Sequence, residues 1–303
     1  MTTEDVERLR RLGGAHFKLS NGWATSVTVA QLSAIIVGAV PGIRDALGQW
    51  TPLLLLALAY LTALSRAVAD RHKGRGDTAL RQVEIADGLG RKIDPGALAD
   101  ALDDASPLVR WMAERERRDQ PYFASTLPPS PARLVANVRE SAWWTKRLAG
   151  DLRAIEFWKV GVIVAAGLLV LRAATLPPSR TPAASIPISQ DLVELATAAV
   201  LFFLTQGPLR RAGEYGALRD GASRVEQHAA SLARTGTITD AGALELAHEY
   251  QIARKGSPLV PTMWWRLRQR RLNALWKEGA ASDLGDASSA GGGPTHNTSF
   301  SAP

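Results

Sequence analysis

Two uncharged apolar runs near the start of the chain most strongly restrict what it can fold into. They cover residues 23–43 and 46–65, and only Arg44 and Asp45 separate them. Each run reaches the roughly 20 residues that a helix needs to cross a bilayer core of about 30 Å. The sequence therefore predicts a first transmembrane hairpin over residues 23–68, with a tight connection between its two helices.

The segment before this hairpin, residues 1–22, mixes both signs of charge, including Glu4, Asp5, Arg10 and Arg11. A signal peptide instead has a short basic start that leads at once into an apolar core. We therefore expect residues 1–22 to form a retained helix on the cytoplasmic side of the membrane.

A second pair of apolar runs covers residues 157–176 and 192–209. Lys159, Arg172 and Glu194 lie near the ends of these runs, where a long side chain can reach the interface. The pattern predicts a second transmembrane hairpin over residues 157–209, in which Arg172 and Glu194 lie at similar depth and pair. The alternative is a buried helical hairpin of a soluble protein.

The distribution of cations predicts the topology. The chain has 36 Lys and Arg against 29 Asp and Glu. Four of these cations precede residue 23, seventeen fall within 66–159 and twelve follow residue 209, which leaves three for the hairpin loops. Because cytoplasmic segments retain Lys and Arg, we expect a multi-pass protein of the bacterial inner membrane with both termini cytoplasmic. This topology accounts for the basic excess, so we expect no nucleic-acid partner.

The cytoplasmic regions, residues 69–156 and 210–279, are expected to be amphipathic, coiled-coil-like helices. Two seams alternate spacings of four and three residues. They consist of Leu134, Val138, Ser141, Thr145, Leu148, Leu152 and Ile155, and of Leu218, Ala222, Val225, Ala229 and Leu232. The first seam leads directly into the third span. It either packs only within one subunit or also couples the cytoplasmic helix to the membrane.

The C-terminal part divides into a basic and a low-complexity segment. Residues 257–279 combine Trp264, Trp265 and Trp276 with a cluster of arginines. Such a helix can lie against an anionic cytoplasmic leaflet, and docking onto the other cytoplasmic helices is the alternative. Residues 280–303 are rich in Gly, Ser and Ala, which predicts disorder. The expected fold class is an all-α membrane protein. It has two transmembrane hairpins with four transmembrane helices in all, and cytoplasmic helices follow each hairpin.

No constellation in the sequence indicates catalysis or metal binding. The chain has no cysteine, and its five histidines show no metal-ligand spacing. Motifs of hydrolases, kinases and dinucleotide-binding enzymes are absent as well. We therefore expect no enzyme activity, no catalytic residue, no metal and no cofactor.

Small and polar side chains in the spans indicate surfaces for contacts between helices. Ala34 and Gly38 belong to a ridge of small residues at four-residue spacing, which lets helices approach closely. The polar side chains are Thr28 and Gln31 in the first span and Thr197 and Thr205 in the fourth. In hydrocarbon these groups need partners, either from another helix or from water in a pore. The lack of a central charge in the spans argues against a proton-coupled transporter. These small and polar side chains favour a weakly polar homo-oligomeric pore.

The block 134–149, LVANVRESAWWTKRLA, lies directly before the third span. Together with the order of hairpins and cytoplasmic helices over roughly residues 10–275, it resembles the pore-forming four-transmembrane effectors of bacterial cyclic-nucleotide antiphage systems. The motif residues are Asn137, Arg139, Glu140, Ser141, Ala142, Trp143, Trp144, Arg147 and Leu148, and a C-terminal element with Pro261, Trp264, Trp265 and Arg268 is similar too.

The resemblance implies an antiviral effector that senses a cyclic nucleotide from a cognate cyclase, oligomerises or opens, and impairs inner-membrane integrity. It implies that Arg139, Lys146 and Arg147 contact the anionic messenger, because cations attract phosphate and the two guanidinium groups can pair with it through two parallel hydrogen bonds. The alternative for these residues is ordinary juxtamembrane positive charge. The alternative function is a membrane scaffold or sensor that recruits a cytosolic partner without permeabilising the bilayer, and a small-solute transporter is the third.

Overall fold

The structure is a computed structural model of the chain, and it describes residues 3–39, 41–116, 123–175 and 207–290. Every element within these ranges is a helix, which confirms the expected all-α class. The elements are α1 (Thr3–Ala39), α2 (Pro41–Leu47), η1 (Gly48–Trp50), α3 (Thr51–Leu89), α4 (Pro95–Asp103), α5 (Pro107–Glu114), α6 (Pro131–Thr175), α8 (Pro208–Thr235), α9 (Asp240–Lys255) and α10 (Thr262–Ala290).

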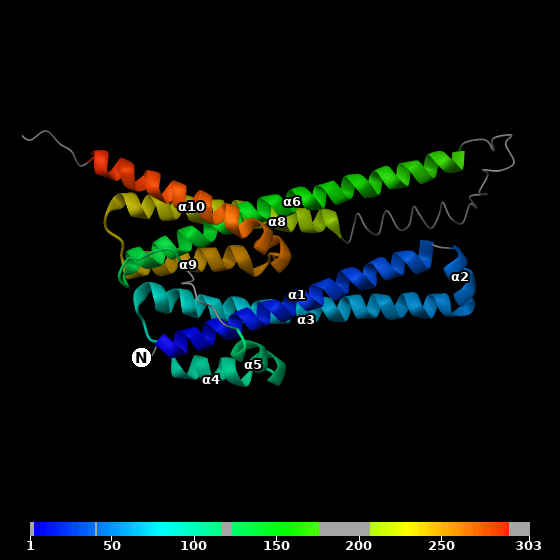
Figure 1. Ribbon diagram of the computed structural model, residues 1–303, viewed down its shortest axis with the longest axis horizontal. Coiled ribbons are helices and arrows are strands. Elements are labelled where there is room, and N and C mark those ends of the chain that lie inside the picture. Colours follow the sequence, from blue (N-terminus) through cyan, green and yellow to red (C-terminus); the bar gives the residue numbers. More distant parts are fainter. Residues whose placement is uncertain (1–2, 40, 117–122, 176–206, 291–303) are drawn as a thin grey trace, which may run out of the picture. The chain divides into compact units, whose positions relative to one another are not determined.

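Helices α1 and α3 form the first long pair. The short elements α2 and η1 turn the chain between them, so α3 runs back alongside α1 (Figure 1). Pro52 lies in the first turn of α3, where its missing N–H costs no helical hydrogen bond. Gly90 ends the helix at a φ of 64°, a left-handed conformation that glycine adopts without strain.

Helices α4 and α5 pack against the N-terminal half of α1. Each begins with a side-chain cap followed by proline: Asp94 accepts a hydrogen bond from the Ala97 N–H, and Ser106 accepts one from the Val109 N–H. The apolar cluster that joins α5 to α1 consists of Leu12, Ala15, Ala105, Val109 and Ala113. The N-terminal segment is therefore part of the packed core and not a free arm.

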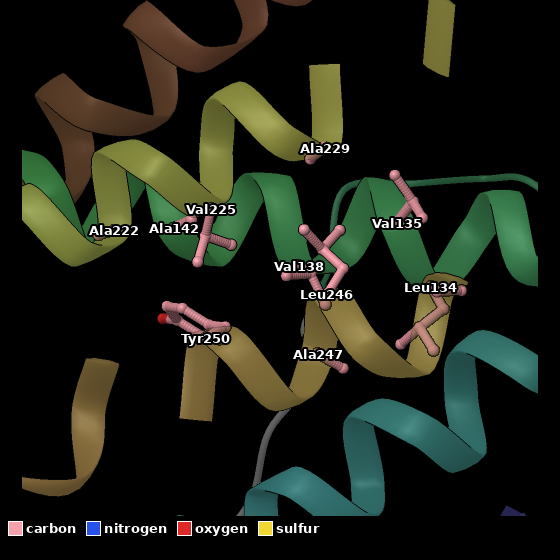
Figure 2. Close-up of a cluster of buried hydrophobic side chains, with 11 residues drawn as sticks. Leu134, Val135, Val138, Ala142, Ala222, Val225, Ala229, Leu246, Ala247 and Tyr250 are labelled. Atoms are coloured by element: carbon pink, nitrogen blue, oxygen red, sulfur yellow. The ribbon is translucent and has the colours of Figure 1, made fainter. Parts of the chain in front are cut away.

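Helices α6 and α8 form the second long pair, and α9 packs against both. Their shared core, shown in Figure 2, contains Leu134, Val135, Val138, Ala142, Ala222, Val225, Ala229, Ala243, Leu246, Ala247 and Tyr250. Leu134, Val138 and Val225 come from the two seams that alternate spacings of four and three, so these seams do pack within one subunit. Helix α6 is unbroken from Pro131 to Thr175, so it joins its seam to the described part of the third expected span.

The two pairs meet where α3 ends and α6 begins. A Cβ atom at Gly88 would lie 2.8 Å from the Leu134 Cα, so a residue with a side chain does not fit here without a shift of α6. The Ser130 N–H donates to the Gly88 carbonyl at 2.8 Å. Helix α9 also contacts α3, and Met1–Thr262 forms one compact unit.

One described helical stretch, Gly42–Leu89, is long and apolar enough to cross a membrane. Only 11% of its most apolar window is buried, whereas the core helix of a soluble protein is mostly buried. This stretch contains the expected second span, 46–65. The other expected spans, 23–43, 157–176 and 192–209, each include residues outside the described ranges, so the four-span architecture stays a prediction.

From Met263 on, α10 belongs to a second unit of the chain, apart from Met1–Thr262. This helix continues to Ala290, into the segment 280–303 for which the composition predicts disorder. Alanine has the highest helix propensity, and the first half of that segment contains several alanines. Residues 291–303 lie outside the described ranges.

Candidate functional site

A group of polar side chains links the two long pairs, and we call it the interhelical polar cluster. Its members are Lys73, Asp77, Glu84 and Asp87 of α3, Arg133, Asn137, Ser141 and Thr145 of α6, and Tyr250 and Arg254 of α9. The members from α6 recur every four residues and those from α3 are spaced by four, seven and three, so each set lies along one helix face. Helix periodicity thus places these side chains on the faces where the two long pairs meet.

Asp87 is the centre of the first set of contacts. Arg133 binds it through two guanidinium nitrogens, with Nη2 2.9 Å from Oδ1 and Nε 3.2 Å from Oδ2. The Asn137 side-chain amide donates to Oδ2 at 3.0 Å. Asn137 is fully buried, while Asp87 and Arg133 each expose 21% of their side chains. A two-point Arg–carboxylate pair of this kind fixes the register of α6 on α3.

Glu84 is the centre of the second set, and its carboxyl is buried. Burial raises the pKa of Glu84 to about 7, and it outweighs the lowering by the Arg254 charge and by hydrogen bonds from Ser141 and Gln251. The Ser141 hydroxyl donates to Oε1 at 3.3 Å. A carboxyl in such surroundings gains or loses its proton near neutral pH, at the contact of three helices.

Helix α9 completes the cluster. The Tyr250 hydroxyl lies 2.7 Å from Thr145 Oγ1 and donates to the Ser141 carbonyl at 3.1 Å. Arg254 Nη2 lies 2.6 Å from Asp77 Oδ1. Lys73 donates both to Asp77, at 2.9 Å, and to the Arg254 carbonyl, at 3.0 Å. These contacts connect α9 to both α3 and α6. The cluster is therefore the junction at which the three helices are held together.

The motif residues that carry the family resemblance divide between this junction and the remaining faces of α6. Asn137 and Ser141 belong to the cluster. Glu140 accepts a hydrogen bond from the Ala124 N–H at 2.9 Å, and burial raises the pKa of its carboxyl. Trp143 is buried, and its ring meets that of Trp144 edge to face, with centroids 6.1 Å apart. Within this subunit, each of these residues has a packing role.

The three cations expected to contact an anionic messenger do not converge on one pocket among the described residues. Lys146 forms an ion pair with Glu226 of α8. The Arg147 guanidinium lies over the Trp143 ring, 4.3 Å from its centroid. Arg139 shares a helix face with Lys146, but two turns, or about 10 Å, separate them along α6. The ligand role of these residues stays a prediction.

The polar and small residues expected in the spans have varied surroundings. The exposed Thr28 hydroxyl donates to the Ala24 carbonyl of its own helix at 3.3 Å, a partner that the sequence interpretation did not consider. Gln31 and Ala34 are half-buried, and a Cβ at Gly38 would meet no atom within 4 Å. The small-residue ridge therefore forms no close contact at Gly38 within the subunit.

Several of the expected membrane residues lie outside the described ranges. They are Thr197, Thr205 and Glu194. Arg172 is an exposed residue near the end of α6, and its expected pairing with Glu194 is therefore not tested.

A histidine pair is the contact that the search for metal spacings missed. The Nδ1 atoms of His16 in α1 and His72 in α3 lie 2.9 Å apart. Burial and then the neighbouring His72 and Arg75 lower the pKa of His16 to about 4, and burial also lowers the pKa of His72. Both rings are thus neutral at pH 7, so the pair joins α1 to α3 by a neutral hydrogen bond.

Within the described ranges, no group of three or more His, Asp or Glu could hold a metal ion. Comparisons of the chain with protein-family models, with curated proteins and with solved structures find no match.

Proposed function

We propose that the chain is a bacterial inner-membrane effector of antiviral defence. In this proposal a cyclic nucleotide binds the cytoplasmic helices, and the protein then oligomerises or opens and impairs membrane integrity. The membrane part is supported by the geometry, whereas the messenger and the defence role come from the resemblance of the block 134–149 to four-transmembrane effectors.

The observation that carries the proposal is the distribution of exposed apolar side chains. Leu56 exposes 67% of its surface, Leu168 61% and Val29 57%. Such residues gather in three helix segments: Val29, Leu32 and Ile36 of α1, Leu53, Leu56, Tyr60, Leu61 and Leu64 of α3, and Phe157, Trp158, Val162, Val164 and Leu168 of α6. A soluble monomer rarely exposes so many large apolar side chains within single helix segments, whereas lipid solvates them.

The continuity of the helices supports a link between the cytoplasmic helices and the membrane. Each of the helices α1, α3 and α6 contains, without a break, a packed polar part and an exposed apolar part. Because a helix is stiff along its axis, a rotation at the junction reaches the apolar end. An anionic messenger at Lys146 would compete with Glu226 and thereby loosen α6 from α8.

Topology can be tested cleanly because the chain has no cysteine. A single cysteine at the exposed Asp45, in α2 between the first two expected spans, is expected to react with an impermeant thiol reagent on intact cells from which the outer membrane has been removed. A cysteine at the exposed Ser231 of α8 is expected to react only after lysis. Equal labelling of both positions before lysis would contradict the proposed topology.

Permeabilisation is tested by dye entry and membrane potential in cells that express the chain with a nucleotide cyclase. Gly38→Leu adds a side chain that meets nothing within the subunit, so a loss of dye entry would report on contacts between copies. Gly22→Leu is the matched control, because position 22 is also open but lies before the first span. Wild-type and Gly22→Leu cells are expected to take up dye, and Gly38→Leu cells are not.

The second candidate function is a membrane scaffold that recruits a cytosolic protein. Leu108 and Trp111 of α5 expose 52% and 48% of their surfaces on a helix outside the expected spans, which favours a protein partner there. Intact membranes at saturating messenger would support the scaffold and contradict the effector.

A further inference from the structure

Helix α10 carries large apolar side chains that are open to solvent. Met263 exposes 74% of its surface and Leu267 65%, more than most exposed apolar residues of the expected spans. Trp265 is 39% exposed. From Met263 on, this helix belongs to the second unit of the chain, and none of these residues lies in an expected span.

The same helix is strongly basic. Residues 263–277 contain Arg266, Arg268, Arg270, Arg271 and Lys277 and no acidic residue. Four arginines within six residues repel one another, and an anionic surface relieves that repulsion. Arginine suits lipid headgroups well, since its planar guanidinium can donate two hydrogen bonds to one phosphate.

Helix geometry places Met263 and Leu267 beside three of these arginines. At 100° per residue, Met263, Leu267 and Ala274 fall within one narrow stripe of α10. Arg266 and Arg270 border this stripe on one side, and Arg271 borders it on the other. Side chains of this length can bind phosphates at the surface while the apolar stripe enters the bilayer boundary.

We propose that α10 lies on the surface of an anionic bilayer, with Met263 and Leu267 in the interface and Arg266, Arg270 and Arg271 on lipid phosphates. The occupant of this surface is a membrane rich in acidic phospholipid. The inference rests on the membrane location in the proposed function and is independent of the pore and the messenger.

The test uses the full chain with Leu267→Cys as its single cysteine, labelled with an environment-sensitive dye, in lipid nanodiscs. Phosphatidylglycerol-containing discs are expected to shift the dye emission to the blue, and discs of phosphatidylcholine alone are not. Each basic residue contributes about 1 kcal/mol at such a surface. Changing Arg266, Arg270 and Arg271 together to Gln is therefore expected to weaken docking by roughly 100-fold.

A matched control removes the same charge elsewhere. Arg219, Arg224 and Arg234 are exposed on α8, and their change to Gln is expected to leave the emission in phosphatidylglycerol discs unshifted from wild type. A dye that reports the same surroundings in both lipids would overturn the proposal, including the case in which α10 docks onto protein.

Co-elution with the discs separates this proposal from the proposed function. If the protein co-elutes with both types of disc and the dye emission is the same in both, only the role of α10 is contradicted. Binding to phosphatidylglycerol discs alone, with a blue-shifted dye, supports α10 and contradicts the spans. Failure to bind either type of disc contradicts both.

Discussion

At the scale of single residues, the junction between the long pairs depends on two carboxyl groups of α3 in different surroundings. Asp87 accepts hydrogen bonds from Arg133 and from the Asn137 amide. Glu84 is enclosed more completely, and its pKa of about 7 means that the buried group holds a proton more readily than in water. The first group stabilises the fold through its contacts with Arg133 and Asn137, and the second stabilises it best when neutral.

Asp87→Ala is expected to lower the free energy of unfolding by about 2–3 kcal/mol, because it leaves Arg133 and the buried Asn137 amide without this partner. Thermal or denaturant unfolding of the detergent-solubilised protein measures the loss. Asp104→Ala is the control: it removes an ion pair with Arg75 in which Asp104 is 64% exposed, and it should cost less than about 1 kcal/mol. Equal losses would contradict the role of Asp87.

Glu84 predicts a pH dependence of stability. Between its ordinary pKa of 4.5 and the folded-state pKa of about 7, the folded protein binds a proton that the unfolded chain has lost. Stability from this group therefore falls as pH rises through that range. Glu84→Gln keeps an acceptor for Ser141 but carries no charge, so its melting temperature should exceed that of the wild type most at pH 8 and least at pH 4.5. Parallel profiles for the two proteins would show that Glu84 does not titrate in this way.

At the scale of elements, the approach of α3 to α6 depends on a glycine. A Cβ at Gly88 would lie 2.7 Å from the Leu134 Cβ and 2.8 Å from its Cα. The backbone of α6 at Leu134 would therefore have to move. Gly74, in the same helix, is open, and a Cβ there would meet no atom within 4 Å. The two positions thus separate packing from helix propensity.

Gly88→Ala is expected to destabilise the fold by about 1–3 kcal/mol through overpacking against α6. Gly74→Ala is expected to stabilise it by about 0.5–1 kcal/mol, because alanine restricts the unfolded chain and favours helix. Melting temperatures of the two variants should move in opposite directions. A rise for both would mean that α3 and α6 lie farther apart than in the structure.

At the scale of the whole molecule, exposed apolar residues in different places should respond differently to charge. Leu56 of α3 and Ile252 of α9 are similarly exposed, at 67% and 60%. Leu56→Arg places a cation near the middle of the expected second span, at a cost of about 2.5–3.5 kcal/mol for insertion. Ile252→Arg places it on a helix outside the expected spans, where water solvates it.

We therefore expect Leu56→Arg to reduce strongly the amount of protein that resists carbonate extraction from membranes, and Ile252→Arg to leave it unchanged. Quantitative blotting of the membrane fraction measures both. Extraction of the wild-type protein without detergent, or equal behaviour of the two variants, would contradict a membrane-spanning protein.

The sequence by itself determined the helical class, the apolar run within Gly42–Leu89 and the seams of α6 and α8. These features are local: a periodicity of 3.6 residues or a run of some 20 apolar residues is complete within one segment of the chain. Leu134, Val138 and Val225 could be assigned to packing faces without knowing which helix covers them.

The tertiary structure alone decided the partners of the polar side chains. Asn137 is 50 residues from Asp87, and Arg254 is 177 residues from Asp77. It likewise placed Lys146 against Glu226 and joined His16 to His72. The neighbouring residues in the sequence do not show whether any of these groups is solvated, paired or bound to a ligand. Charges and hydrogen bonds act over a few ångströms of space, so their partners follow from how the helices pack together and not from sequence spacing.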